Sequence, residues 1–410
     1  MAASSHVSKS LISSYLGRGT DVALFDRVLL NAPRVLASAA LLLTAGCDRS
    51  GSGPVRIGVA GSFSDPIGTP MQLAAELAAE EINAAGGVAG RPLELVIRDD
   101  YADPDSAVFV ANDLYESGVS AVIGHIFSGM SLAAAPVYNG GSEPVAAISP
   151  SSSSPELTSA GDYTFRICPS DLAHGSALAH WVSERLHFTR GAVLFLNDQY
   201  GRGIRQTFVT EFTRLGGQLE SIDPYLGDRP DVGAYLDRLA RSGKAEFLIV
   251  AGNIGEAEEI IRQARRRGLA IPVLGGDGLE GIHEAGALAE GVYLSSAYFP
   301  DLPTEGNRRF VSAYRRKYPR AGTPNQPAAA AYDAVYLLRD VIARVGTDRE
   351  AVRRELAGVG SATPPFEGVT GTVAFDAAGD VPNQNVYIGL VRNGSVQVAE
   401  DATETVAQVP

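Results

Sequence analysis

The stretch 82-INAAGGVAGRPLELVIRDD-100 contains the end of one predicted helix and the whole of the strand that follows it. The helical pattern begins at Met71 and stops at Ala85, because Gly86 and Gly87 favour the backbone conformations that end a helix. Leu93 to Arg98 is a short run of mainly apolar residues, typical of a strand buried on both faces. A helix followed by such a strand indicates the βαβ units of a parallel sheet.

The same alternation surrounds this stretch. Short apolar runs and helical periodicity predict strands at Val55 to Gly61, Ala121 to Gly124 and Pro144 to Ile148, and a helix from Asp105 to Ser117. Asp103 is a candidate N-cap of that helix, with Pro104 in its first turn. These elements predict a first α/β lobe built on a parallel sheet.

A second series of alternating elements follows. It comprises a helix from Leu172 to Leu186, helices that end at Leu215 and Arg267, and the strands 192-AVLFLND-198, 246-EFLIVAG-252 and 272-PVLGG-276. After these come helical patterns at Glu305 to Tyr318 and Gln326 to Val345, and strands near Gly371 to Phe375 and Val386 to Val391. The last segments have too few strands for a third core, so we expect them to complete the two lobes. The predicted fold class is α/β, with two doubly wound parallel-sheet lobes.

Composition narrows the class of protein. The chain has 410 residues, of which 45% are hydrophobic and 20% charged, typical of a globular protein of two or three domains. A formal net charge of -13 disfavours nucleic acid and anionic membrane surfaces as partners, because both attract positive charge. The basic run 262-RQARRR-267 indicates the solvated face of a helix that ends at Gly268.

The N-terminal region resembles a bacterial lipoprotein signal. Cys47 ends the apolar run 35-VLASAALLLTAGC-47, which follows Arg34 and is far too short to span a bilayer. The resemblance implies cleavage before Cys47 and lipidation of its thiol, outside the cytoplasmic membrane; a secretion signal or a buried helix is the alternative. We expect residues 1–46 to be a signal peptide with a misassigned N-terminal extension, residues 47–54 the lipidated cysteine and tether, and residues 401–410 a tail.

The sequence has no convincing catalytic or metal-binding motif. Walker A, G-x-S-x-G and H-E-x-x-H patterns are absent, the six histidines are scattered, and two cysteines are too few for a zinc cluster. The segment 276-GDGLEG-281 matches G-x-G-x-x-G, but it lies late in the second lobe and indicates a Gly-rich turn. Cys168 is expected to be a small buried residue. We therefore expect no enzyme, with no catalytic residues, cofactor or metal.

Polar and glycine-rich segments follow the predicted strands, namely 61-GSFSDP-66, 124-GHIFSG-129, 149-SPSSSSPEL-157, 197-NDQYG-201, 252-GN-253 and 275-GGDG-278. Because the carboxyl ends of parallel strands share one edge of a sheet, two lobes that face each other at these edges form a cleft. Serine hydroxyls and backbone N–H groups suit a carboxylate, and Asp277 suits an ammonium group. The strand ends therefore predict a cleft for a small zwitterion, although the serine run alone would also suit a flexible linker.

Several segments carry a family resemblance: 82-INAAGGVAGRPLELVIRDD-100, 122-VIGH-125, 148-ISP-150, 155-PELT-158, 197-NDQYG-201 and 262-RQAR-265. They resemble the leucine/isoleucine/valine-binding protein family, the type I periplasmic substrate-binding proteins of branched-chain amino acid ABC transporters. The resemblance extends over about residues 54 to 392. Because several such segments occur in order along the chain, the resemblance is far more specific than any single motif.

The resemblance implies a Venus-flytrap receptor of two lobes joined by three crossings, which closes on one amino acid and delivers it to ABC permease transmembrane subunits. The lobes would comprise residues 55–169 with 300–380, and residues 170–299 with 381–400. We expect a monomer, periplasmic or at the cell surface, held to the membrane by its lipid anchor. A sensory or regulatory lipoprotein of the same fold, which controls a cell-envelope partner, is the alternative.

The resemblance also assigns the ligand-binding residues Ser128, Ser151, Ser152, Ser153, Tyr200, Asn253 and Asp277. It implies that the Ser128 and Ser153 hydroxyls and the backbone of the serine loop hold the ligand carboxylate. Tyr200 would line the second lobe's side of the cleft, and Asp277 would bind the ammonium group. Each assignment has a structural alternative, since the serines and Asp277 also suit helix caps and Tyr200 also suits packing within its own lobe.

The chain departs from the family at three points. It lacks a Tyr after 63-FSDP-66, it has Asn253 at the position of an aromatic residue, and it has Ala102 and Phe127 at the positions of a disulfide. Because Asn253 adds a polar contact, an aliphatic ligand side chain is not assured. A branched-chain amino acid, a polar amino acid, an amide and a small carboxylate all stay open as ligands.

Overall fold

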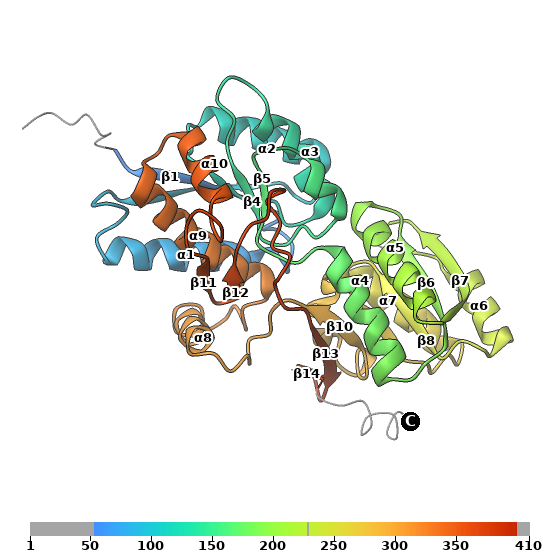
Figure 1. Cartoon of the computed structure of the whole chain (residues 1–410). Helices are drawn as coiled ribbons and strands as arrows, with labels where there is room; N and C mark the ends of the chain where they lie inside the picture. Colours follow the sequence, from blue (N-terminus) through green and yellow to red (C-terminus); the bar gives the residue numbers. More distant parts are fainter. Residues whose placement is uncertain (1–52, 228, 400–410) are drawn as a thin grey trace, which may run out of the picture. The chain divides into compact units, whose positions relative to one another are not determined.

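The computed structural model describes residues 53–227 and 229–399 (Figure 1). The predicted signal peptide, the lipidation of Cys47 and the tail at residues 401–410 lie outside the described residues. Within them the chain folds around two separate sheets, and a short hairpin of two strands makes a third. We call the five-stranded sheet with its helices the first lobe, and the seven-stranded sheet with its helices the second lobe.

The first lobe has the strand order β2-β1-β3-β4-β5, with every pair parallel. Its strands are β1 (Val55–Gly61), β2 (Leu93–Asp99), β3 (Val122–Ile123), β4 (Ala147–Ser149) and β5 (Thr164–Arg166). The helices between them are α1 (Thr69–Ala84), α2 (Pro104–Glu116) and α3 (Ser128–Asn139). Buried side chains of α1 pack on one face of the sheet and those of α2 and α3 on the other, as a doubly wound fold requires.

The second lobe has the order β14-β13-β10-β9-β8-β6-β7. Its strands are β6 (Arg190–Leu196), β7 (Gln218–Tyr225), β8 (Phe247–Ala251), β9 (Val273–Gly275), β10 (Tyr293–Ser296), β13 (Tyr387–Arg392) and β14 (Ser395–Val398). Its helices are α4 (Asp171–His180), α5 (Gln199–Arg214), α6 (Gly233–Ser242) and α7 (Ile254–Arg266). The strands from β10 to β7 are parallel, whereas β13 and β14 are antiparallel additions at one edge.

The C-terminal segments return to both sheets. The helices α8 (Glu305–Lys317), α9 (Gln326–Val345) and α10 (Arg349–Ala357) contribute buried side chains to the cores of the first lobe. The hairpin β11 (Phe366–Gly368) and β12 (Gly371–Val373) follows, and β13 then joins the second sheet. The chain therefore crosses between the lobes more than once, as expected from the small number of strands in this region.

Local capping explains several helix boundaries. The Asp103 side chain accepts a hydrogen bond from the Ser106 N–H at 2.8 Å and Pro104 occupies the first turn of α2, so that predicted start is confirmed. The predicted bounds of β1 and α9 also agree with the structure. The predicted helix from Leu172 to Leu186 is also present, but it is α-helical only to His180 and continues as a π-helical turn at Trp181–Arg185.

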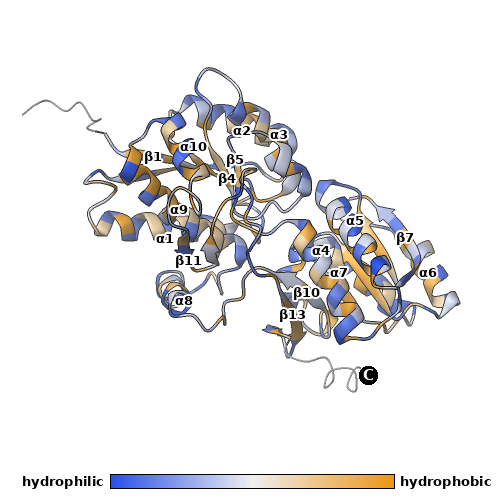
Figure 2. Ribbon diagram, in the orientation of Figure 1, coloured by the Kyte–Doolittle hydropathy of each residue, from blue (hydrophilic) through white to orange (hydrophobic). Residues whose placement is uncertain are grey.

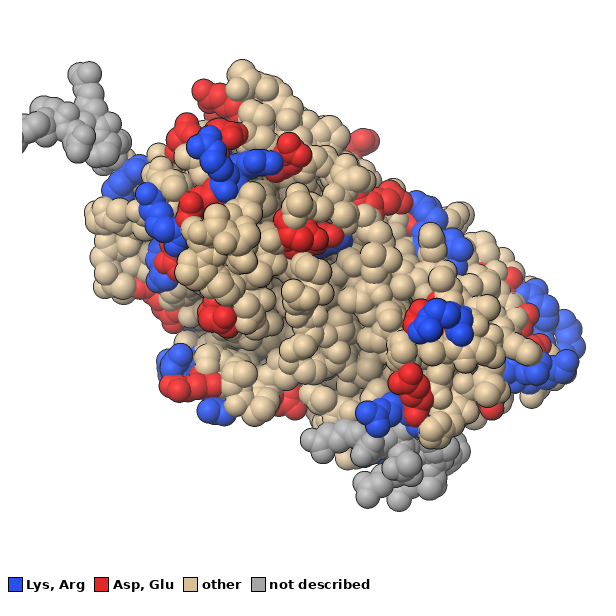
Figure 3. Space-filling view, viewed as in Figure 1, with Lys and Arg blue, Asp and Glu red and all other residues tan. Residues whose placement is uncertain are grey.

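The sheets carry the cores, and the surface carries charges of both signs. Figure 2 shows hydrophobic residues along the central strands of the second lobe and polar residues on the outer faces of its helices. Figure 3 shows acidic and basic side chains interspersed on the visible face. The basic run is a solvated helix face, as predicted, since Arg262 and Arg266 pair with Glu259. Among the helices that the structure describes, none is long and apolar enough to cross a membrane.

Candidate functional site

A cavity of about 520 Å³ lies where the carboxyl ends of strands from both sheets meet. Its lining comes from the loops and helix starts that follow β1, β2, β3 and β4 in the first lobe and β6, β8 and β9 in the second. This is the edge at which open parallel sheets bind ligands. The polar strand ends that the sequence pattern singled out therefore converge on one site.

The structure brings six of the seven predicted ligand-binding residues to this cavity: Ser128, Ser151, Ser153, Tyr200, Asn253 and Asp277. Ser152 is the exception: it does not line the cavity, so its assignment as a ligand-binding residue is corrected. Its hydroxyl lies 2.6 Å from the Ser131 hydroxyl and donates to the Ile126 carbonyl at 3.1 Å, inside the first lobe. Its neighbours in the serine loop face the cavity, so Ser152 stabilises the loop from behind.

The serine loop is an ordered part of the core and not a linker. Ser152, Ser153 and Ser154 are almost completely buried. The Ser154 N–H donates to the Ser128 hydroxyl at 3.2 Å, which joins the loop to the start of α3. Ser153 belongs to the lining of the cavity, and its buried hydroxyl lies beside the buried carboxyl group of Asp171. A serine hydroxyl at the edge of a cavity is suited to donate a hydrogen bond to a ligand oxygen.

Arg166 on β5 holds the loop and does not itself line the cavity. Its Nη1 donates to the carbonyls of Ser153 and Ser154 at 3.1 and 2.8 Å. Its Nε and Nη2 donate to the two carboxylate oxygens of Asp380, each at 2.7 Å. This buried bidentate pair orients the loop carbonyls away from the cavity. Arg166 was not among the predicted site residues, although a single arginine within the otherwise apolar run 165-FRIC-168 is a detectable signal.

The second lobe contributes a carboxylate held by an aromatic hydroxyl. The Tyr200 hydroxyl donates to Asp277 Oδ1 at 2.9 Å and accepts from the Gly278 N–H at 2.8 Å. His174 Nε2 lies 3.7 Å from Asp277 Oδ2, and burial lowers the pKa of His174, which favours the neutral imidazole. Burial, followed by the charge of Asp277, raises the pKa of Tyr200, so its hydroxyl stays a donor. Asp277 therefore faces the cavity as an acceptor.

A second buried carboxyl group, that of Asp171, lies close to Asp277. Asp171 begins α4, its N–H donates to the Ser153 carbonyl at 2.7 Å, and its buried carboxyl group lies beside the Ser153 hydroxyl. Burial and then the negative charge of Asp277 raise the pKa of Asp171 well above its usual range. Asp171 and His174 were not among the predicted site residues, because no local pattern distinguishes them from ordinary residues of an amphipathic helix.

The starts of α5 and α7 complete the second lobe's side of the cavity. Asp198 caps α5 by accepting from the Gly201 N–H at 2.7 Å, and Glu256 accepts from the Asn253 N–H at 3.1 Å in a capping arrangement. Asp198, Asn253 and Glu256 nevertheless also line the cavity. Capping and ligand binding are compatible here, because both use groups at a helix N-terminus.

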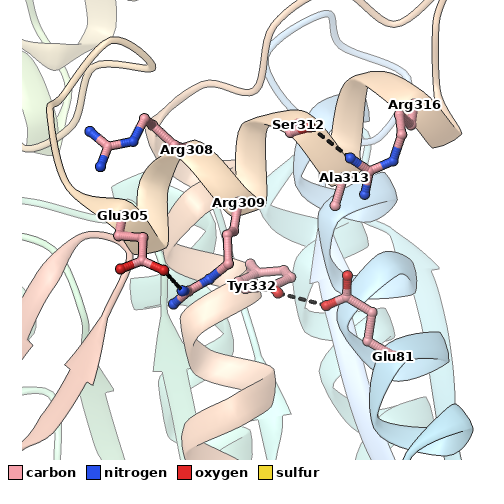
Figure 4. Close-up of a pocket in the computed structure, with 8 residues that line it drawn as sticks. All are labelled: Glu81, Glu305, Arg308, Arg309, Ser312, Ala313, Arg316 and Tyr332. Carbon is pink, nitrogen blue, oxygen red and sulfur yellow. Dashed lines mark hydrogen bonds and ion pairs between the residues drawn. The ribbon is translucent and has the colours of Figure 1, made fainter.

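A larger surface groove, of about 610 Å³, lies between α1, α8 and α9 (Figure 4). Its charged side chains are engaged by neighbouring groups: Arg309 pairs with Glu305, Arg316 donates to the Ser312 hydroxyl at 2.6 Å, and Glu81 accepts from the Tyr332 hydroxyl at 2.6 Å. It contains no strand end and none of the predicted site residues. The cavity at the strand ends is therefore the candidate site. Within residues 53–227 and 229–399, no group of three or more acidic, His or Cys residues is placed to bind a metal.

Two α/β lobes with a polar, partly buried cavity at their strand ends form a site suited to a small ligand. The chain belongs to the periplasmic binding protein family, whose model matches residues 54–395. It is accordingly an ABC transporter solute-binding protein, as the resemblance implied.

Three related proteins are similar to this chain over most of their length. A leucine-, isoleucine-, valine-, threonine- and alanine-binding protein of Pseudomonas aeruginosa is 31% identical over 344 residues, which cover 80% of this chain and 87% of the relative. A branched-chain amino acid transporter substrate-binding protein of Streptococcus pneumoniae, solved with isoleucine, is 31% identical with a TM-score of 0.76, and covers 85% of this chain and 99% of its own. A leucine-binding protein of Thermotoga maritima is 30% identical with a TM-score of 0.77, over 84% and 98% of the two chains.

Proposed function

We propose that this protein is the extracytoplasmic solute-binding lipoprotein of an ABC importer and binds an amino acid in the cavity at the strand ends. The observation that carries the proposal is the pairing of two unlike groups across one cavity. The first lobe supplies Ser128, Ser151 and Ser153, and the second supplies Asp277, held by Tyr200. A carboxylate acceptor facing hydroxyl and N–H donors is complementary to the ammonium and carboxylate of an α-amino acid.

The proposed ligand pose follows from these contacts. The α-carboxylate accepts hydrogen bonds from Ser128, Ser153 and the Ser151 backbone, where Arg166 has already engaged the loop carbonyls. The α-ammonium group donates to Asp277. Binding energy from the second lobe adds to that of the first only when both contact the ligand, which favours the closed arrangement of the lobes. The related branched-chain amino acid-binding proteins support an amino acid as the ligand.

A binding panel tests the proposal. Calorimetry of the chain beginning near Ser52 with single amino acids and small carboxylates should show one-site binding by at least one amino acid. Ser153→Ala should weaken that binding, since it removes a hydroxyl proposed to donate to the ligand carboxylate. If small carboxylates without an amino group bind equally well, Asp277 has been given the wrong role. If nothing binds, the transport assignment gives way to a regulatory lipoprotein of the same fold.

Lipidation is a separate part of the proposal and is supported by the sequence of the signal alone. We expect the full chain to incorporate labelled palmitate and to fractionate with membranes in a bacterial host, and Cys47→Ala to abolish both. Cys168→Ala is the matched control, because Cys168 is buried and burial raises the pKa of its thiol. Labelling that persists in Cys47→Ala would refute the lipoprotein assignment.

A further inference from the structure

Tyr101 is an exposed aromatic residue at the edge of the ligand cavity. It lies in the turn between β2 and α2, it belongs to the lining of the cavity, and it is 68% exposed. Two other aromatic residues, Phe127 and Tyr200, line the same cavity. Phe127 packs against the core of the first lobe, and Tyr200 is only 8% exposed and donates to Asp277. Of these three aromatic side chains, that of Tyr101 therefore has the most surface left for a ligand.

The turn that carries Tyr101 is fixed to the core of the first lobe. The Tyr101 N–H donates to Asp99 Oδ1 at 2.8 Å, and the Ala102 N–H donates to Asp100 Oδ1 at 3.0 Å. Asp100 is fully buried and accepts from the Ser62 hydroxyl at 2.6 Å. Buried groups therefore set the position of the Tyr101 backbone, which does not depend on the exposed ring.

The backbone conformation of this turn is unusual. Tyr101 and Ala102 both have a φ of 54°, in the left-handed region that residues other than glycine seldom adopt. Such conformations cost free energy, persist only where the surrounding structure enforces them, and are concentrated at functional sites. An exposed ring contributes little to folding, so the stability of the fold does not explain why this turn presents a tyrosine.

The first lobe places Tyr101 at the far end of an apolar wall. The cavity lining also includes Ile67, which follows β1, and Ile126 and Met130, which follow β3. In the strand order β2-β1-β3-β4, these residues lie between Tyr101 and the serine loop that follows β4. Three strand spacings separate that loop from the turn of Tyr101, or about 14 Å at the sheet. A ligand whose carboxylate lies at the serine loop therefore needs a long side chain to reach the tyrosine ring.

We propose, on the basis of the function proposed above, that Tyr101 is a specificity-determining residue and that the preferred ligand is an amino acid with an aromatic side chain. The α-carboxylate and α-ammonium groups of the ligand lie at the serine loop and at Asp277. The side chain extends along Ile126 and Met130, and its ring packs against that of Tyr101. Two aromatic rings in offset or edge-to-face contact add affinity beyond that of the apolar area they bury. The cavity of about 520 Å³ has room for such a side chain.

Phenylalanine and alanine provide the decisive pair of ligands, because they share the α-amino acid group and differ by one phenyl ring. We expect calorimetry to show that the protein binds L-phenylalanine at least about tenfold more tightly than L-alanine, and also more tightly than L-leucine. Equal or tighter binding of alanine or leucine overturns the inference and leaves the proposed function intact. If no amino acid binds, the proposed function itself is overturned.

Variants of Tyr101 locate the contact. Tyr101→Ala should weaken phenylalanine binding about tenfold and alanine binding less than about threefold, whereas Tyr101→Phe keeps the ring and should bind both ligands as the wild type does. Phe109→Ala is the matched control, because Phe109 is 74% exposed on α2 and does not line the cavity. Unchanged phenylalanine affinity in Tyr101→Ala, or an equal loss for both ligands, overturns the assignment of Tyr101. The wild-type ligand series decides the aromatic preference even if a variant fails to fold.

Discussion

Asp277 is a single residue whose surroundings, rather than its type, make it a candidate for ligand binding. Its two carboxylate oxygens are held differently, one by the Tyr200 hydroxyl at 2.9 Å and the other 3.7 Å from a histidine nitrogen. Asp171, with its own buried carboxyl, lies close enough for the charge of Asp277 to raise its pKa. A cation from solution would relieve this accumulation of negative charge, which is why the ammonium group is placed here.

We predict that Asp277→Asn weakens amino acid binding and leaves the fold intact. The amide keeps an oxygen for the Tyr200 hydroxyl and nearly the same volume, so the fold should persist, whereas the charge that attracts the ammonium group is lost. We expect amino acid affinity to fall by about tenfold to a hundredfold, the worth of a charge-assisted hydrogen bond. Calorimetry with the best ligand of the panel measures this, with the exposed Asp301→Asn as control. Unchanged affinity would remove Asp277 from the site.

At the scale of elements, the serine loop depends on a strand that local patterns did not reveal. β5 has only three residues, yet it places Arg166 behind the loop and pairs with β4 through Ser149 and Ile148. The helix α6 and the strand β7 were also missed. β7 alternates with polar residues at the edge of its sheet, so its hydrophobic signal is weak. Long, strongly periodic elements such as α9 were predicted correctly for the opposite reason.

We predict that the serine loop depends on Arg166 for its stability. Arg166→Met keeps the length of the side chain but leaves Asp380 and two loop carbonyls without their partner, in a pair whose side chains are only 1% and 19% exposed. We expect the free energy of unfolding to fall by about 3 to 5 kcal/mol and ligand binding to weaken. Denaturant unfolding measures the first effect and calorimetry the second.

A matched arginine provides the control. Arg98 also pairs with an aspartate, Asp113, at 2.6 Å, but both side chains are about two-fifths exposed. Arg98→Met should therefore cost less than about 1 kcal/mol and leave binding unaffected. If the two variants behave alike, Arg166 has no special role in holding the loop.

At the scale of the whole molecule, one buried carboxyl group connects the two lobes. Glu280 Oε2 accepts from the Gln326 N–H, at the start of α9, at 2.9 Å, and its Oε1 accepts from the Ser296 hydroxyl of β10. Gln326 Nε2 in turn donates to the Pro150 carbonyl at 2.9 Å, next to the serine loop. A hydrogen-bonded path thus runs from the second sheet through the crossing to the binding loop.

The buried Glu280 carboxyl group predicts that the free energy of unfolding depends on pH. Burial raises its pKa from 4.5 to about 8, so between these values the folded protein holds a proton that the unfolded chain has released. This contribution to stability is fully present below about pH 4.5 and is lost as the pH rises through about 8. It amounts to at most about 1.4 kcal/mol per pH unit. Urea unfolding of the wild type between pH 5 and pH 8 should show the decline.

Glu280→Gln is the test, because glutamine imitates the protonated acid and does not titrate. The difference in unfolding free energy between wild type and variant should shift in favour of the variant as the pH rises. The exposed Glu284→Gln, on the segment that follows, should retain the wild-type pH dependence. Parallel curves for Glu280→Gln and the wild type would contradict the assignment of the proton to Glu280.

The amino-acid sequence by itself determined the alternation of helices and strands, the helix caps, the family and the polar character of the strand ends. These are properties of short segments, set by local periodicity, backbone preferences and capping. Only the tertiary structure decided that Ser152 faces away from the cavity, that Arg166 and Asp380 hold the serine loop, and that Asp198 and Glu256 join Asp277 on one wall. These facts join residues as far apart as 214 positions along the chain. They depend on how sheets and helices pack, and no local pattern of residue types encodes which distant side chains that packing brings together.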